Sequence, residues 1–369
     1  MKAREPEDSG RRSACFRSLR KPLLFLACAA LICRAGAASY PGDVLYNSGG
    51  DPQYIILTCK SVDLYLVAAW YAPNASAAGI GMTPAAEMFF DVYSENGFIG
   101  KLDSYIPDGN AMGKVPLLLM HADLPSLAPL APVTYGKNEE DLIKGLRRFY
   151  EDTKADEFFR AVGTGTDGER NSFLIKRNVQ DTKNNNLLAV LKEAESYAGN
   201  IKKYYGSKKI SYYSVMSPFA KTGAGHRVDL KDQVIFVDLQ SINELQFAQA
   251  AVHDFLHCFL SPAVDAQKKL ISELSKGKDV KDYTISAYEL YSWDKIFEEC
   301  LVRAVQARIY KKVFGEDRAI SDIIEPEEIK GVRQLEKTYK LLEGYEKDRA
   351  KYPAIEDFIH ILIKEYFTV

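Results

Sequence analysis

Two of the five histidines in this 369-residue chain lie four positions apart, in the segment His253-Asp254-Phe255-Leu256-His257. Residues at i and i+4 share one face of a helix, so both imidazoles can reach a single tetrahedral metal ion. The same geometry underlies the H-E-x-x-H signature of zinc metallopeptidases. Because histidine is scarce here, we interpret His253 and His257 as metal ligands. A helix with two structural histidines and no metal is the alternative.

A third ligand is expected, because catalytic zinc commonly takes three protein groups and keeps one position for water. The best candidate is Glu299, which lies 42 residues after His257 in the next long helix. Other acidic candidates are Glu289, Asp294 and Glu298. Without the histidines, Glu298 and Glu299 would be read as a solvated helix face. Arg303, one turn after Glu299, is predicted to hold its carboxylate, or else to form a structural ion pair.

Asp254 occupies the position of the signature's glutamate. That carboxylate normally accepts a proton from the attacking water and passes it to the leaving amine. An aspartate is one methylene shorter, roughly 1.5 Å, and misplacement on that scale costs on the order of 100-fold in rate. We predict Asp254 as the general base, with an active, a slow and a non-catalytic zinc site all open. An oxyanion donor is open among His226, Tyr288 and Tyr291.

The elements that must position these residues are expected to be a strand followed by a capped helix. Ser241 and Glu244 fit a capping box, which predicts a helix from 241 to about 260, before Pro262. The preceding segment, 234–239, predicts a strand, either in the core or at an edge that could pair with an extended peptide. A further strand is expected over 210–216, with a loop over 222–226. Helices are expected over 142–153, 156–162, 185–205, 263–275, 286–313 and much of 326–367.

The region before residue 136 has a different texture. Short apolar runs at 54–58, 62–71, 88–93 and 115–120, separated by turn residues, are typical of strands or buried elements. Pro125, Pro129 and Pro132 indicate a loop or linker. We therefore predict an α+β protein with a smaller β-rich N-terminal region at 38–135 and a larger domain at 136–369. The first region could be a propeptide, a docking domain or part of one fold.

Residues 1–37 are predicted to be a signal peptide. Basic residues precede an apolar run at 23–33, and Ala35-Gly36-Ala37 follows as a cleavage site. An uncleaved N-terminal membrane anchor is the alternative. Cleavage would remove eight Lys/Arg and three Asp/Glu, changing the net charge from −2 to −7. The signal peptide predicts a secreted or periplasmic protein. The acidic charge of the remaining chain predicts that it binds no nucleic acid. The lack of another long apolar run predicts that it does not stay inserted in a membrane.

Three cysteines lie beyond that segment: Cys59, Cys258 and Cys300. An odd count excludes a full disulfide framework but allows one bridge. Cys258 follows His257 and Cys300 follows Glu299, so a Cys258–Cys300 bridge is a hypothesis for an exported protein, with buried thiols as the ordinary alternative. Asn74-Ala75-Ser76 matches a glycosylation sequon, which matters only in a eukaryotic secretory host.

Several motifs together resemble a family catalogued as domain of unknown function 4932, a group of secreted zinc peptidases. They are His253 to Pro262, Trp293-x-x-Ile296-x-x-Glu299-x-x-x-Arg303-Ala304, Leu146 to Thr153 with Phe158-Phe159, and Ser217-Pro218. The resemblance runs from about residue 138 to 310 and is faint over 40–135. It implies a zincin-like fold in the C-terminal domain with His253, His257 and Glu299 as zinc ligands. The chain departs from the family pattern at Asp254.

The expected function is therefore zinc-dependent hydrolysis of peptide or protein substrates by an exported protein, through a metal-activated water and weakened by Asp254. The alternative is a non-catalytic zinc-binding protein that acts outside the cell or in the periplasm.

Overall fold

The computed structural model describes residues 44–48, 53–72, 80–105, 122–123, 128–129, 137–162, 166–199, 205–206, 208–221, 223–229, 233–280 and 292–368. The expected signal peptide at 1–37, the sequon at 74–76, the apolar run at 115–120 and two of the three linker prolines lie outside these residues. Among the described helices, none combines the length and apolar character needed to cross a bilayer.

A five-stranded sheet forms the centre of the molecule, in the order β1-β2-β5-β7-β6. Three inner strands, β2, β5 and β7, are parallel, while β1 and β6 are antiparallel edge strands. Their bounds are β1 Val44–Asn47, β2 Gln53–Thr58, β5 Lys209–Ser217, β6 Ala224–Asp229 and β7 Gln233–Ser241. Strands β3 (Ala122–Asp123) and β4 (Ala128–Pro129) pair separately.

The sheet confirms the two expected strands, shows that the apolar run at 54–58 is a strand rather than another buried element, and corrects one expectation. Segments 54–58, 210–216 and 234–239 all lie in strands. The expected loop at 222–226 is wrong in its second half, which begins β6. Of the two possibilities left open for 234–239, the structure confirms the core strand, because β7 lies between β5 and β6. Its almost wholly apolar sequence fits burial on both faces, as parallel inner strands require.

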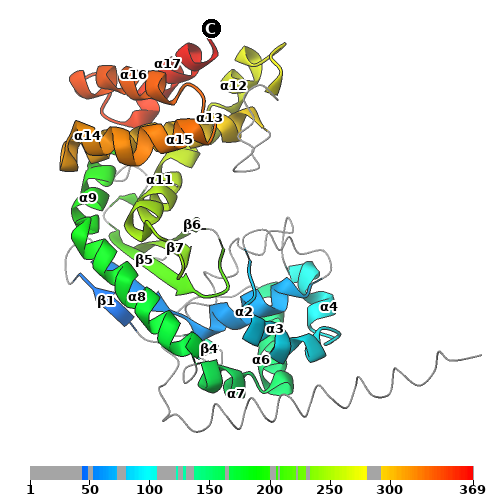
Figure 1. Ribbon diagram of the computed structural model, residues 1–369. Helices are drawn as coiled ribbons and strands as arrows, with labels where there is room; N and C mark the ends of the chain where they lie inside the picture. The colour runs from blue at the N-terminus through cyan, green and yellow to red at the C-terminus, as the bar shows by residue number, and fades with distance from the viewer. Residues whose placement is uncertain are drawn as a thin grey trace, which may run out of the picture.

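One face of the sheet packs against the helix that carries both histidines. This helix, α11 (Phe247–Asp265), lies between the sheet and α13 (Trp293–Phe314), as Figure 1 shows. Aromatic residues on that face, such as Tyr212 and Phe236, pack against Phe255 and Phe259 of α11. Further helices complete this layer: α8 Thr166–Asn184, α9 Leu187–Ala198, α12 Lys268–Leu274, α14 Glu316–Ala319, α15 Glu325–Ile329, α16 Leu335–Lys347 and α17 Ile355–Phe367.

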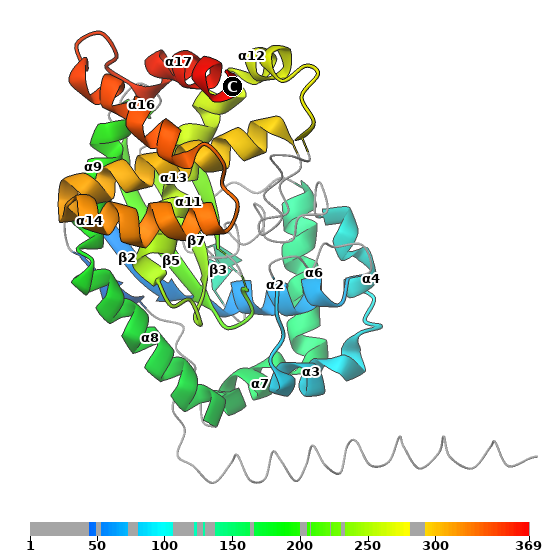
Figure 2. The same cartoon turned by 45° about the horizontal axis from the view of Figure 1, so that its top comes forward.

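The opposite face of the sheet has its own helical cover. Val215, Val237 and Leu239 point into a second apolar cluster. The helices that build it gather away from α16 and α17 in Figure 2. They are α2 Lys60–Trp70, α3 Pro84–Phe90, α4 Ile99–Leu102, α6 Lys137–Thr153 and α7 Ala155–Val162, with short 3₁₀ turns at Asp91–Tyr93 and Asp103–Tyr105. The apolar run at 62–71 is thus helical and mostly buried, whereas the helical run at 88–93 buries only Phe89 and Phe90.

The α+β class is confirmed, and the N-terminal region shares the central sheet with the C-terminal part of the chain. β2 pairs with β5 along its whole length, and Tyr54 at its start is fully buried. Of the roles left open for the N-terminal region, this pairing supports part of one fold.

Several helix boundaries differ from those expected. The motif helix begins at Phe247, because Ser241 still pairs with Ser217 in the sheet and its hydroxyl accepts from the Asn243 amide. The capping box is therefore wrong; Glu244 instead accepts from the Gln246 amide ahead of the helix. The helix also continues through Pro262, since a proline near its end removes only one backbone hydrogen bond. Gly315, at φ 98°, ends α13 as expected.

Candidate metal centre

Three side chains from two helices converge at the α11–α13 interface. His253 and His257 lie one turn apart on α11, with their Nε2 atoms 3.1 Å from each other. Glu299 of α13 places Oε1 3.5 Å from the His253 Nε2 atom and Oε2 3.3 Å from the His257 Nε2 atom. These donor atoms all lie within 4.8 Å of one another, and we call them the His–His–Glu group.

The spacing and chemistry of the group fit a bound metal ion. Donors about 2.1 Å from a tetrahedral ion stand about 3.4 Å apart, close to the three distances here. Imidazole and carboxylate are ligands that first-row divalent ions share. Two of the residues, His253 and Glu299, are buried, and the His253 Nδ1 atom has no hydrogen-bond partner among the described residues. The group can therefore bind a metal ion.

A carboxylate next in sequence to Glu299 orients His257. The His257 Nδ1–H donates to Glu298 Oε1 at 2.9 Å, which turns Nε2 toward the group. Glu298 also accepts from Lys295 Nζ at 2.8 Å and from the Ser261 hydroxyl. A carboxylate in this place fixes both the tautomer and the ring orientation of a ligating histidine. Glu298, one of the alternative ligands, thus contacts His257 at Nδ1, the ring nitrogen that is not part of the His–His–Glu group.

The charges of the group are strongly coupled. Burial lowers the pKa of His257, but hydrogen bonds to Glu298 and Glu299 outweigh it and raise that pKa to about 9. Burial favours protonated Glu298, yet the bond from His257 leaves its pKa at about 2. The pKa of Glu299 is also lowered, since the nearby histidines and Arg303 outweigh its burial. Burial, with Arg303 nearby, lowers the pKa of His253 well below its usual value. The metal-free group therefore carries its proton on His257.

Arg303 lies where the sequence places it, beside Glu299. Its Nε atom donates to Glu299 Oε1 at 2.9 Å and lies 3.4 Å from Glu327 Oε2. Glu327 is buried and pairs with Lys330 at 2.9 Å. It comes from α15, which follows a π-helical turn at Ile320–Ile324. Nothing in the spacing of the sequence indicated Glu327, because only the packing of α15 on α13 brings it to Arg303.

Asp254 lies on the side of α11 that faces the sheet. Its Oδ2 atom accepts from Gln240 Nε2 at 2.7 Å, and burial raises its pKa to about 6. A hydrogen bond also joins it to Asp238 of β7. The sequence interpretation missed Gln240 and Asp238. The signal was two polar residues spaced by two at the end of an otherwise apolar strand, which puts both on one face.

The remaining candidates do not join the group. In the β6–β7 register, His226 lies opposite Val237, whose side chain packs on the face of the sheet away from α11. It is therefore wrong as an oxyanion donor. Asp294 lies at the start of α13, 3.7 Å from Lys268 Nζ. Three other candidates, Tyr288, Glu289 and Tyr291, lie outside the described residues.

The hypothesis of a Cys258–Cys300 bridge is wrong, because both thiols are free, as is Cys59. Consecutive helix residues point about 100° apart. His257 and Glu299 converge, so the residues after them diverge. The Cys258 Sγ atom lies 3.6 Å from the Asp254 carbonyl oxygen, and the Cys300 Sγ atom lies 3.5 Å from the Thr338 hydroxyl.

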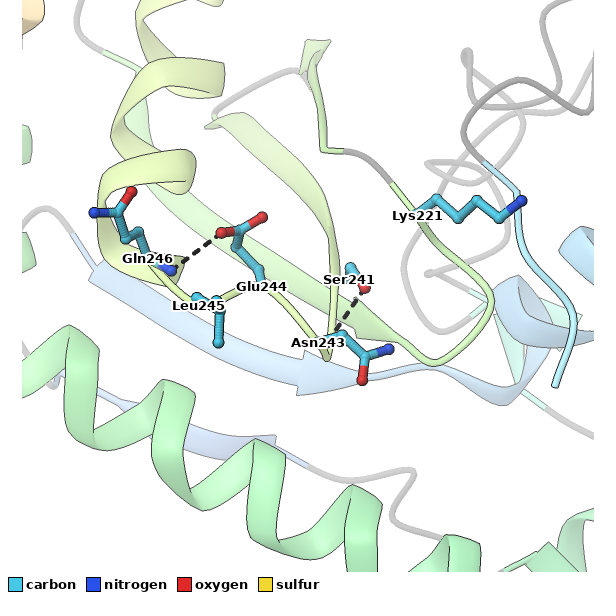
Figure 3. Close-up of a pocket in the computed structure, with 6 residues that line it drawn as sticks. All are labelled: Lys221, Ser241, Asn243, Glu244, Leu245 and Gln246. Carbon is cyan, nitrogen blue, oxygen red and sulfur yellow. Dashed lines mark hydrogen bonds between the residues drawn. The ribbon is translucent and has the colours of Figure 1, made fainter. Parts of the chain in front are cut away.

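A separate pocket of about 450 Å³ lies between the end of β7 and the start of α11. Figure 3 shows its lining residues: Lys221, Ser241, Asn243, Glu244, Leu245 and Gln246. None of them belongs to the His–His–Glu group. Two of the labelled residues already accept hydrogen bonds within this loop: Ser241 from the Asn243 backbone amide and Glu244 from the Gln246 backbone amide. We assign this pocket no role in metal binding.

Fold and site together define an α+β protein with a candidate metal centre between two packed helices. Residues 134–365 match the model of the family described as domain of unknown function DUF4932, and the chain belongs to that family. Comparison with curated proteins gave no match, and comparison with solved structures gave none either.

Proposed function

We propose that this protein is an exported zinc-dependent hydrolase of peptide bonds, with His253, His257 and Glu299 as zinc ligands. The observation that carries the proposal is the convergence of three ligand atoms from α11 and α13 at distances suited to a tetrahedral ion. Export is proposed from the sequence of residues 1–37 alone.

Zinc bound there would lower the pKa of a water molecule and polarise the scissile carbonyl. The residues of the chain have separate tasks. Glu298 fixes the ring of His257, and Arg303 fixes the carboxylate of Glu299. Asp254, with a pKa of about 6, is ionised at neutral pH and acts as general base.

The substrate class is proposed to be an extended peptide. β6 is the outer strand of the described sheet on the side next to α11, and it packs against this helix. An edge strand can add a peptide by backbone pairing, with side chains alternating above and below. This role was one of two left open for 234–239, and we assign it to β6 instead, because β7 is an inner strand.

The proposal is tested with the purified protein, a mixture of peptides and mass spectrometry of the products. We expect cleavage that a chelator abolishes and zinc restores. His253→Ala should remove it, whereas His360→Ala, which changes a histidine of α17 outside the group, should retain it. Cleavage that survives both chelation and His253→Ala would overturn the proposal.

A non-catalytic zinc-binding protein is the second candidate. The observation that favours it is the short Asp254 side chain, whose carboxylate is already hydrogen-bonded to the sheet. Asp254→Glu distinguishes the two candidates. A gain in peptide cleavage supports an impaired enzyme, while stoichiometric zinc with no cleavage in either form supports the binding protein.

A further inference from the structure

A chain of buried polar side chains crosses three strands of the sheet toward the candidate metal centre. The Tyr54 hydroxyl of β2 donates to Ser214 Oγ at 2.8 Å, and Ser214 Oγ donates to Asp238 Oδ2 at 3.2 Å. All three residues have no exposed surface. Polar groups at such depth cost free energy unless they are paired. Apolar residues would fill this face at lower cost, so the chain of contacts requires an explanation beyond packing.

The chain of contacts ends at Asp254. Gln240 uses both protons of its amide, donating to Asp238 Oδ1 at 2.8 Å and to Asp254 Oδ2 at 2.7 Å. The two carboxyl groups are also hydrogen-bonded to each other. Asp254 is thus tied to β7 by two separate partners, immediately after the ligand His253.

The start of the edge strand β6 lies directly against the same residue, Asp254. A Cβ atom on Gly223 would lie 2.2 Å from Asp254 Oδ2, and one on Gly225 would lie 2.2 Å from the Asp254 carbonyl oxygen. No side chain fits at either position unless its surroundings move. Gly223, just before β6, and Gly225, within it, let this segment pass directly over Asp254, which limits the space in which its carboxylate can turn.

Two carboxyl groups that share a buried hydrogen bond need a proton between them, since like charges at this distance cannot both stay ionised. Burial, with the charge of Asp254 next, raises the pKa of Asp238 well above its usual value. Asp238 is the deeper of the two, and this burial outweighs the hydrogen bonds from Ser214 and Gln240, which lower its pKa. The shared proton is therefore placed on Asp238.

We propose that Asp238 is a positioning residue: its carboxyl group keeps a proton, donates it in a hydrogen bond to Asp254, and with Gln240 fixes the direction of the Asp254 carboxylate. This inference rests on the proposed function for its catalytic meaning.

The first test is infrared spectroscopy of the purified protein, which needs no activity. Asparagine has the shape of a protonated aspartic acid and keeps a donor toward Asp254. The difference spectrum of wild type against Asp238→Asn at neutral pH should contain the carbonyl band of a protonated carboxylic acid. Its absence would overturn the proposal, whether or not the protein cleaves peptides.

The second test is kinetic. Asp238→Asn should keep kcat within about threefold of wild type. Asp238→Ala should lower kcat about 100-fold, the cost of a misplaced reacting group, with KM and zinc affinity unchanged. An alanine variant with wild-type kcat, or an asparagine variant as slow as the alanine variant, would contradict a positioning role.

The matched control is Asp63→Asn, a fully buried aspartate beneath the other face of the sheet that accepts from the Ser217 hydroxyl at 2.5 Å. Burial raises its pKa to about 8, so this variant should lose an acid band of its own while keeping wild-type kcat. If Asp238→Ala fails to fold, the infrared band and the asparagine variant still decide. If the protein shows no peptide cleavage, the proposed function fails while the infrared result still judges the proton on Asp238.

Discussion

At the scale of single residues, the candidate centre depends on side chains that orient the ligands from behind. Glu298 orients His257, and Arg303 orients Glu299. The Nδ1 atom of His253, in contrast, has no hydrogen-bond partner among the described residues. The pKa values of the two histidines therefore shift in opposite directions. His257 is the basic one and His253 the neutral one, and metal binding must displace the proton from His257.

Zinc binding is expected to release about one proton at pH 7, because His257 is protonated below its pKa of about 9 and must be neutral to bind. Apparent affinity should then rise up to about tenfold per pH unit and level off near pH 9. Calorimetric titration at one pH in buffers of different ionisation enthalpy measures the proton count. A binding enthalpy that does not depend on the buffer would be inconsistent with this assignment.

Arg303→Ala is expected to weaken zinc binding about 10- to 100-fold, the usual effect of removing a group that orients a ligand. It leaves Glu299 free to turn and Glu327 buried beside an empty space. A competition titration with a zinc chelator measures the change. Arg318→Ala, which removes an exposed pair with Asp322, is the control and should bind zinc like wild type.

At the scale of elements, the close approach of β6 to α11 is the feature that most constrains the site. Gly225 lies in β6 opposite Asp238, and its Cα position leaves no room for a methyl group next to the α11 backbone. Glycine is thus required here for the contact rather than for an unusual turn.

Gly225→Ala is expected to lower the free energy of unfolding by roughly 1–3 kcal/mol, the usual cost of overpacking, because strand and helix must separate. Urea unfolding measures the difference. Gly97→Ala is the matched control, since a Cβ atom there meets nothing within 4 Å. Equal stability of the two variants would show that β6 does not pack on α11 as described.

The sequence predicted which residues form the site better than it predicted how the helices and strands that carry them pack together. The i, i+4 spacing placed His253 and His257 together, and the distance along the chain to the next helix indicated Glu299. Long-range register decided the rest. Whether His226 faces α11 depends on its pairing with Val237, and Asp238 reaches Asp254 only because α11 lies across β7. The start of α11 moved for the same reason, as sheet pairing of Ser241 overrode a local cap.

At the scale of the whole molecule, one sheet joins regions that the sequence separates at residue 135. β2 is an inner parallel strand beside β5, and the helices α2 to α4 cover the face of the sheet that α11 leaves free. The core that supports the candidate centre therefore includes residues from both regions.

A chain shortened to residues 136–369 is expected to lose cooperative unfolding and zinc binding, because β5 would expose the edge that β2 covers and Tyr54 would leave the polar chain of contacts. Circular dichroism during thermal unfolding and a zinc titration would measure both. A shortened chain that unfolds cooperatively at the wild-type temperature would show that residues 38–135 are a separate unit.

The central claim is that His253, His257 and Glu299 hold one zinc ion. Elemental analysis of the purified protein, together with His253→Ala, Glu299→Ala and the control His360→Ala, tests it most directly. We predict about one zinc per chain in wild type and in the control, with loss in the other two variants. Wild-type protein without stoichiometric zinc, or with zinc unchanged by His253→Ala, would contradict the account.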